Sequence, residues 1–207
     1  MIRPIAVAAL ALVGISTGLA AQKKPIARAL STGSLSGQSV AVLPITMVIA
    51  HPGLAAGAVP SGHPALIGWA DSLISEAFTS RGPEIRWKLP PELRRVSKRG
   101  AGYVPEPDFM GQSVLRTWGI VVVPDPLRGN LRRLSAIVGD RLVMVPASII
   151  LRPLPNDSAR AELSAAMVDT RLGRVIWRTF ITADGATPAA AVDQALAIML
   201  PVEGSSQ

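Results

Sequence analysis

Apolar and polar residues follow one another along this chain in blocks that predict strands and helices in mixed order. Residues 39–49 are a β-branched apolar run that predicts a buried first strand, and a Pro/Gly/Ala-rich loop follows over 50–62. Pro64 then opens an amphipathic helix, because a proline in the first turn lacks only an amide that has no partner there. This helix is predicted to end near Gly82, with Asp71 on the side away from its apolar stripe.

The central part of the chain predicts shorter elements. Residues 84–89 alternate in the manner of a half-exposed strand, and a small helix begins at Pro90 with apolar residues inward and basic residues in water. Residues 120–123 fit either a strand or a buried segment that approaches the sheet. Asp125 predicts a helix cap, with Pro126 in the first turn of the helix that follows.

The last third of the chain predicts a strand, a hairpin and a final helix. Residues 141–151 form a second strongly apolar strand, in which Pro146 indicates a bulge or a sheet edge. The segments 161–168 and 174–182 flank a turn over 169–173 and therefore predict a β-hairpin.

Asp169 and Gly173 are expected to shape the turn of this hairpin. An aspartate accepts hydrogen bonds from turn amides, and a glycine adopts the left-handed conformation that closes such a loop. The downstream strand departs from strict alternation, which predicts a bulge near residues 178–179. Thr187 is expected to cap the last helix, which ends before Pro201.

The order of these elements predicts the fold class. We expect an α/β (α+β) fold: a single domain of two or three layers, with helices packed on a mixed sheet of about five strands. A C-terminal β-hairpin followed by a helix completes it. The predicted organisation is a signal peptide over 1–21, a flexible linker over 22–38, the domain over 39–202 and a disordered tail over 203–207.

The amino-terminal segment has the layout of a secretory signal peptide. Arg3 supplies a short positive start, residues 5–13 are almost wholly apolar, and small residues near Ala20 and Ala21 suit cleavage. The alternative is a retained membrane anchor, although glycine, serine and threonine soften the second half of the segment. We therefore expect a periplasmic or extracellular protein.

Composition adds a strongly basic balance. The chain holds 21 Lys and Arg against 14 Asp and Glu, and it has no cysteine that could carry a lipid or form a disulfide. Outside the cytoplasm the available polyanions are lipid head groups, lipopolysaccharide and acidic wall polymers, so no nucleic acid partner is expected. The alternative to polyanion binding is an arginine-rich surface that is simply solvated. The candidate polyanion-binding residues are Arg94, Arg95, Lys98, Arg99, Arg128, Arg132 and Arg133.

Catalytic signatures are weak throughout the sequence. A metal site from His51, His63 and Asp71 is conceivable, but exposed loop histidines explain the pattern better. The stretch 33–37 resembles a serine nucleophile elbow, yet its central residue is leucine. Paired acids for glycoside cleavage have candidates only by nearness in sequence, namely Glu84, Glu92, Glu106 and Asp108. We expect no enzyme, no cofactor and no metal.

Two local phrases carry a family resemblance. Residues 39–44 read SVAVLP, and residues 167–178 read MVDTRLGRVIWR. These phrases resemble the strand and the hairpin of the TolB amino-terminal domain and of CsgG-like families. The resemblance implies a non-enzymatic α/β module on the periplasmic side that serves envelope assembly or secretion. The lipidated members carry a cysteine after the leader, and this chain does not.

The function expected from these observations is a non-catalytic, envelope-associated protein-interaction or assembly module. Its partner would be another envelope protein, bound at an exposed sheet edge or at the loop over 50–62. The alternative is a polyanion-binding protein that uses the arginine-rich face.

Overall fold

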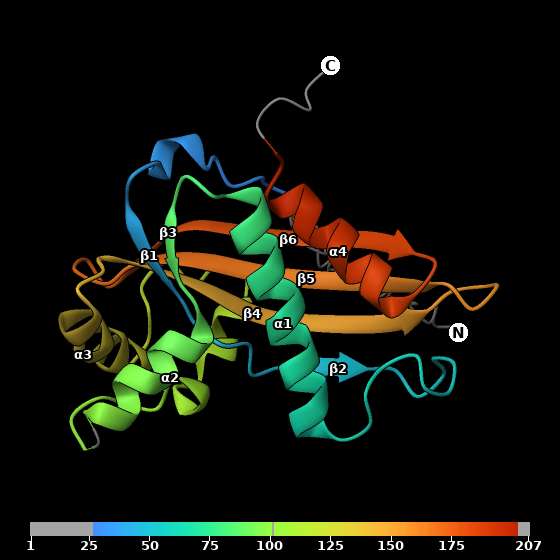
Figure 1. The fold of residues 1–207 in the computed structure, drawn as a ribbon, viewed down its shortest axis with the longest axis horizontal. Coiled ribbons are helices and arrows are strands. Elements are labelled where there is room, and N and C mark those ends of the chain that lie inside the picture. Colours follow the sequence, from blue (N-terminus) through green and yellow to red (C-terminus); the bar gives the residue numbers. More distant parts are fainter. Residues whose placement is uncertain (1–26, 101, 203–207) are drawn as a thin grey trace, which may run out of the picture.

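Five strands of this protein lie side by side in the order β3-β1-β4-β5-β6, and a sixth, β2, also pairs with β4. Figure 1 shows this arrangement in a computed structural model, which describes residues 27–100 and 102–202. The strands are β1 (Ser39–Val42), β2 (Val48–Ala50), β3 (Arg86–Lys88), β4 (Leu142–Pro153), β5 (Ala159–Asp169) and β6 (Arg174–Gly185).

The sheet is mixed, as predicted. β1 runs parallel to both β3 and β4, and β2 runs parallel to β4. β4, β5 and β6 form a long antiparallel meander. The apolar run over 39–49 supplies two strands instead of one, because it breaks at Pro44, which has no amide to donate to a ladder. This break explains why the sheet has six strands where about five were expected.

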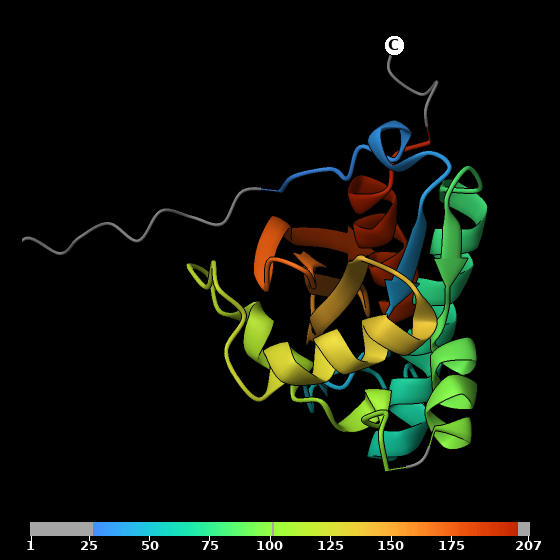
Figure 2. The same ribbon diagram turned by 90° about the vertical axis from the view of Figure 1, so that its left-hand side faces the viewer.

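Helices cover both faces of the sheet and make three layers. α1 and α4 lie in front of the strands in Figure 1, whereas α3 crosses the other side of the sheet in Figure 2. α2 lies beside α3. The helices are α1 (His63–Arg81), α2 (Pro90–Arg99), α3 (Leu127–Val138) and α4 (Pro188–Met199), with short 3-10 turns η1 (Gly33–Leu35), η2 (Pro107–Phe109) and η3 (Gln112–Arg116).

Alternate residues of β4 divide the interior into two hydrophobic cores. Met144 and Ile149 face the core beneath α1 and α4, while Val143 and Val145 face the core beneath α3. Because β4 is covered on both faces, its sequence is an almost continuous apolar run rather than an alternating one.

Two predicted bulges had different outcomes. The register between β4 and β5 shifts between Pro146 and Ser148, which confirms a bulge next to Pro146 in a central strand. On β6 the prediction was wrong in position, because Trp177 pairs with Met167 and Val175 pairs with the adjacent Val168. The extra residue is therefore Ile176, whose side chain points outward, and residues 178–179 pair regularly.

The two predicted helix caps also had different outcomes. Thr187 Oγ1 accepts a hydrogen bond from the Ala190 amide at 3.1 Å, so the predicted cap of α4 is confirmed. The predicted cap at Asp125 was wrong: α3 begins at Leu127, and no side chain caps it. The carboxylate of Asp125 instead forms an ion pair with Arg128, one turn along the helix.

The segment over 27–38 packs on the domain. Leu30 and Leu35 are buried, and the Leu30 amide donates to the Met199 carbonyl at 2.8 Å. The predicted signal peptide (1–21), residues 22–26 of the predicted linker and the tail over 203–207 lie outside the described residues. In the part of the chain that the structure describes, no helix is both long and apolar enough to cross a bilayer.

Candidate protein-interaction groove

An apolar hollow of about 480 Å³ runs beside the start of β6. One wall is the loop over 118–121, the floor is β6 over 175–178, and the far end is Ala27. We call this hollow the β6 groove.

Large apolar side chains line the β6 groove without being covered. Trp118 is 49% exposed, Val121 is 52% exposed and Ile176 is 47% exposed. Single exposed apolar residues are ordinary on a protein surface, but several around one hollow indicate a binding site. Ile176 takes part because it is the bulge residue of β6, and a bulge turns a side chain out of the regular pleat.

Arg178 fixes the loop that forms the wall of the β6 groove. Its guanidinium donates to the carbonyls of Leu115, Thr117 and Ile120, at 2.7 Å to Thr117 and 2.9 Å to Ile120. Burial lowers the pKa of this guanidinium. Gly119 has a φ of +96°, a conformation that glycine adopts readily, and so lets the loop turn directly after Trp118.

The outer edge of β6 is partly free for pairing. Residues 28–29 lie against residues 177–179, where the Arg28 amide donates to Thr179 Oγ1 at 2.9 Å and the Trp177 indole donates to the Ala29 carbonyl at 3.2 Å. At the start of β6, the Val175 amide donates to the Val121 carbonyl at 2.9 Å and the Val123 amide donates to Gly173 at 3.0 Å. The segment 120–123, for which a strand or a buried approach was open, is thus a short bridge to β6. Beyond Val175, no backbone–backbone bond reaches this edge from the residues that the structure describes.

The rim of the β6 groove is basic. Arg28 and Arg178 line it, and Arg174 lies exposed at the start of the same strand. Across residues 27–100 and 102–202, no carboxylate lies within ion-pair distance of these three guanidinium groups. The groove therefore combines an apolar lining with uncompensated positive charge.

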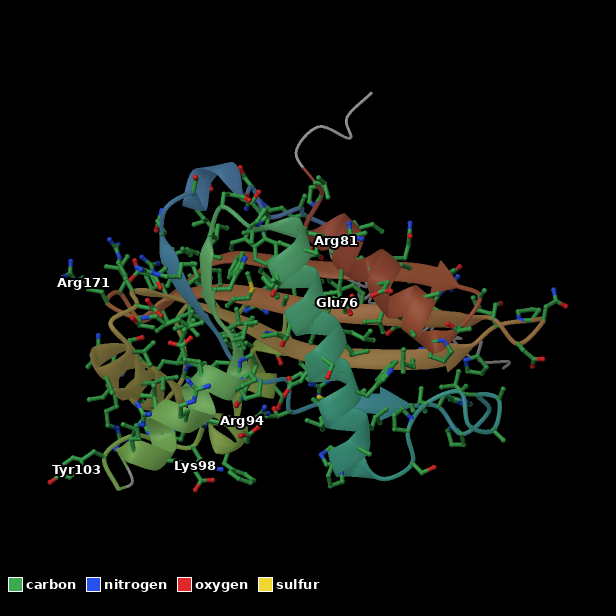
Figure 3. The ribbon with its side chains drawn as sticks, in the orientation of Figure 1. Glu76, Arg81, Arg94, Lys98, Tyr103 and Arg171 are labelled. Atoms are coloured by element: carbon green, nitrogen blue, oxygen red, sulfur yellow. The ribbon has the colours of Figure 1, made fainter. Side chains whose placement is uncertain are left out.

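The predicted polyanion-binding residues lie on two neighbouring helices, but Arg94 is engaged internally. In Figure 3 Arg94 and Lys98 extend from α2. Arg94 donates to Asp71 at 2.7 Å and to both carboxylate oxygens of Asp108, which joins α2 to α1 and η2. Arg95, Lys98 and Arg99 are exposed on α2.

The three predicted arginines of α3 have local partners. Arg128 pairs with Asp125, and Arg133 donates to the Asn130 side chain at 3.0 Å. Arg132 reaches the Thr170 and Arg171 carbonyls at 3.4 Å each. These bonds hold α3 and the β5–β6 turn in place, whereas among the described residues no side-chain hydrogen bond or ion pair engages Arg95, Lys98 or Arg99 of α2.

The turn predicted between β5 and β6 has a bonded aspartate and a left-handed glycine. Asp169 Oδ1 accepts from the Leu172 amide at 3.0 Å, and Arg141 donates to Asp169 Oδ2 at 2.8 Å through Nε. Gly173 has a φ of +65°, and its amide donates to the Asp169 carbonyl at 2.8 Å. This closed turn sets where β6 begins.

The hypothetical metal site does not assemble. No group of three His, Cys, Asp or Glu side chains suited to a metal occurs in the described chain. His51 Nδ1 accepts from the Gly53 amide, while Asp71 is buried and bonded to Ile45 and Arg94. Of the four acids weighed for glycoside cleavage, Asp108 is held by Arg94.

Sequence reasoning missed the residues of the β6 groove. Trp118, which is half-exposed beside the groove, was not among the predicted binding residues. Arg28 lies in the predicted linker, and Ile176 lies in the predicted second strand of the hairpin, 174–182. One available signal was the apolar stretch 120–123, for which a strand and a buried approach segment both remained open.

No family model matches, and no curated protein matches. The LpoB C-terminal domain from Salmonella enterica has 12% identity and a TM-score of 0.41, over 71% of this chain and 82% of that one. Hypothetical protein CT253 from Chlamydia trachomatis has 17% identity and a TM-score of 0.41, over 71% and 72%. The PelC dodecamer from Paraburkholderia phytofirmans has 11% identity and a TM-score of 0.37, over 84% and 95%.

Identities and TM-scores in this range assign neither a family nor a function. The resemblance to the TolB amino-terminal domain and to CsgG-like families therefore stays a prediction.

Proposed function

We propose that this protein is a non-catalytic, envelope-associated interaction module that binds another protein at the β6 groove. The observation that carries the proposal is the gathering of exposed Trp118, Val121 and Ile176 beside a partly open strand edge. Exposed apolar side chains supply the free energy of burial, and an open edge supplies backbone hydrogen bonds.

The proposed compartment is the periplasm or the extracellular space. It rests on the leader over 1–21, and the partner is accordingly an envelope protein. The proposed activity is recognition alone, for which the exposed side chains of the β6 groove suffice without a cofactor.

Site-specific photo-crosslinking tests this proposal. A photoreactive residue at position 176 is expected to give one discrete crosslinked species in intact cells. The matched control is position 137, because Ile137 is also apolar and 60% exposed but lies on α3, away from the groove. With the captured partner purified, Ile176→Asp is expected to weaken binding at least ~10-fold, about 1.4 kcal/mol. Equal crosslinking from both positions, or none from position 176, contradicts the proposal.

The second candidate function is polyanion binding by α2. Arg95, Lys98 and Arg99 favour it, because among the described residues no carboxylate forms an ion pair with any of them. Basic residues near an anionic membrane contribute roughly 1 kcal/mol each, so replacing all three by alanine is expected to lower vesicle affinity about 100-fold.

The control for this second candidate is Arg128→Ala, because the guanidinium of Arg128 is already paired with the Asp125 carboxylate. Sedimentation with vesicles of anionic phospholipid, at two salt concentrations, measures the effect. Unchanged sedimentation of the triple α2 variant would exclude the polyanion function.

A further inference from the structure

We infer that the β6 groove takes an extended segment of another protein in which apolar and acidic residues alternate. This inference rests on the proposed interaction function and specifies the chemistry of its partner. Three properties of the groove lead to it: its strand edge, its apolar lining and its unpaired cations.

The strand edge requires an extended partner. β6 continues for ten residues beyond Val175, which is roughly 33 Å at the usual rise of a strand. A segment laid along this edge exposes its side chains alternately to the two sides. Side chains on one side of that segment would meet Trp118, Val121 and Ile176, so apolar residues are expected at every second position.

The cations of the rim require acids in the partner. Arg28 and Arg178 line the groove, Arg174 directly precedes the lining residue Val175, and none of the three has a carboxylate within ion-pair distance among the described residues. Arg178 is half-buried, and the groups nearest to it are carbonyl oxygens. An acidic side chain brought to this rim gains charge-assisted hydrogen bonds at the same time as the apolar surface is covered.

The positive charge of the rim also argues against two other occupants of the β6 groove, namely the chain's own upstream segment and a second copy of the chain. The segment directly upstream of Ala27 contains Lys23 and Lys24, which would bring like charges to a basic rim. A second copy paired edge to edge on a two-fold axis would bring the rim arginines of both copies together. The acid that β6 itself offers, Asp184, is already bound by Arg160 through contacts of 2.6 and 2.8 Å. A foreign acidic segment meets neither difficulty.

Peptide binding to the chain over 22–207 tests the inference. The probes are fluorescein-labelled nine-residue peptides that alternate valine with glutamate, valine with lysine, or serine with glutamate. The valine–glutamate peptide is expected to bind saturably in fluorescence anisotropy, at least ~10-fold tighter than either of the others. Its affinity is expected to fall as salt rises.

A charge reversal makes the test specific to the groove. Arg28→Glu with Arg174→Glu is expected to weaken the valine–glutamate peptide at least ~10-fold and to strengthen the valine–lysine peptide. The matched control, Arg95→Glu with Arg99→Glu on α2, carries the same charge change away from the groove and is expected to leave the preference intact. Arg178 is left in place because it holds the neighbouring loop.

The possible failures are distinguishable. Crosslinking from position 176 together with equal binding of all three peptides overturns the acidic-segment inference while the interaction function stands. Absence of both crosslinking and peptide binding overturns the two together. A concentration-dependent dimer that Ile176→Asp dissolves would assign the groove to a second copy, and tighter peptide binding after removal of residues 22–26 would assign it to the chain's own segment. Either result overturns the inference.

Discussion

Asp71 and Asp169 are two nearly buried aspartates whose surroundings act on them in opposite directions. Burial raises the pKa of the Asp71 carboxyl, and bonds from Arg94 and the Ile45 amide only partly offset it. Burial also acts to raise the pKa of Asp169, but the bonds from Arg141 and the Leu172 amide outweigh it, so that this pKa is lowered.

These directions give opposite pH dependences of stability. Asp71 has a raised pKa in the folded state, so its contribution is present at low pH and is lost as pH rises through that pKa. Asp169 has a lowered pKa, so its contribution is present above the unfolded value near 3.8 and is lost as pH falls through the folded value. Urea unfolding from pH 2.5 to 7 measures both effects against the Asp71→Asn and Asp169→Asn variants.

As pH rises, the wild-type protein is expected to lose stability relative to the Asp71→Asn variant. Over the same range it is expected to gain stability relative to the Asp169→Asn variant. Parallel curves for the wild-type protein and either variant would contradict the corresponding assignment.

Gly173 gives a second prediction at this scale, because its left-handed backbone disfavours any side chain. Gly173→Ala is expected to destabilise the protein by about 1–2 kcal/mol. An added Cβ would also meet Arg128 Cδ at 2.8 Å, but that flexible side chain can move away. The matched control is Gly129→Ala inside α3, where the nearest atom is 3.9 Å away and alanine is expected to stabilise by about 0.5–1 kcal/mol. Equal unfolding free energies for the two variants would contradict this account.

The hydrogen bonds of the turn at Asp169 and Gly173 could be predicted from the sequence, because they join residues only a few positions apart. The hydrogen-bond partners of Asp71 could not be predicted. That residue was placed on the exposed side of its helix, but its partners come from the segment after β1 and from α2. Their approach depends on how α1 and α2 pack, which local spacing does not record.

At the scale of elements, β6 and α4 meet at a point that admits no side chain. A Cβ on Gly185 would lie 2.3 Å from the Ala191 amide nitrogen and 2.6 Å from the Ala190 carbonyl carbon. Both are backbone atoms near the start of α4, which Thr187 caps. The strand and the helix therefore touch at this corner through their backbones.

Gly185→Ala is expected to destabilise the protein by about 3 kcal/mol, because α4 must shift to admit the methyl group. Gly68→Ala on α1 is the matched control: no atom lies within 4 Å of its Cβ position, and alanine is expected to stabilise the helix. Thermal unfolding of both variants checks the pair. A change below about 1 kcal/mol for Gly185→Ala would contradict the close approach.

Long elements could be predicted and their irregularities could not. The apolar run of β4, the hairpin and the cap at Thr187 follow from local patterns. The bulge at Ile176 depends on pairing with β5, so it has no reliable local pattern. The break between β1 and β2 has a local sign in Pro44, but where each strand resumes depends on pairing with β4. At Asp125 the residue type suited a cap, but the helix begins two residues later and the carboxylate binds Arg128.

At the scale of the whole molecule, the layers could be predicted and the groove could not. The alternation of strand and helix patterns implies a sheet covered by helices, and both faces are indeed covered. The β6 groove instead collects residues 27–28, 118–121 and 175–178, which lie far apart in sequence. A sheet edge was expected as the binding surface, but only the assembled fold identifies which edge has apolar walls and a basic rim.

The bond from the Leu30 amide to the Met199 carbonyl has a consequence for the order in which the protein assembles. It joins the first described segment to the last helix, and the Trp177 indole bonded to the Ala29 carbonyl adds a second long-range contact. A chain that emerges amino end first can place residues 37–38 against the β3 region, but residues 29–30 have no finished place until β6 and α4 have followed. Contacts so distant in sequence slow folding, so closing this corner of the structure depends on the last helix of the chain.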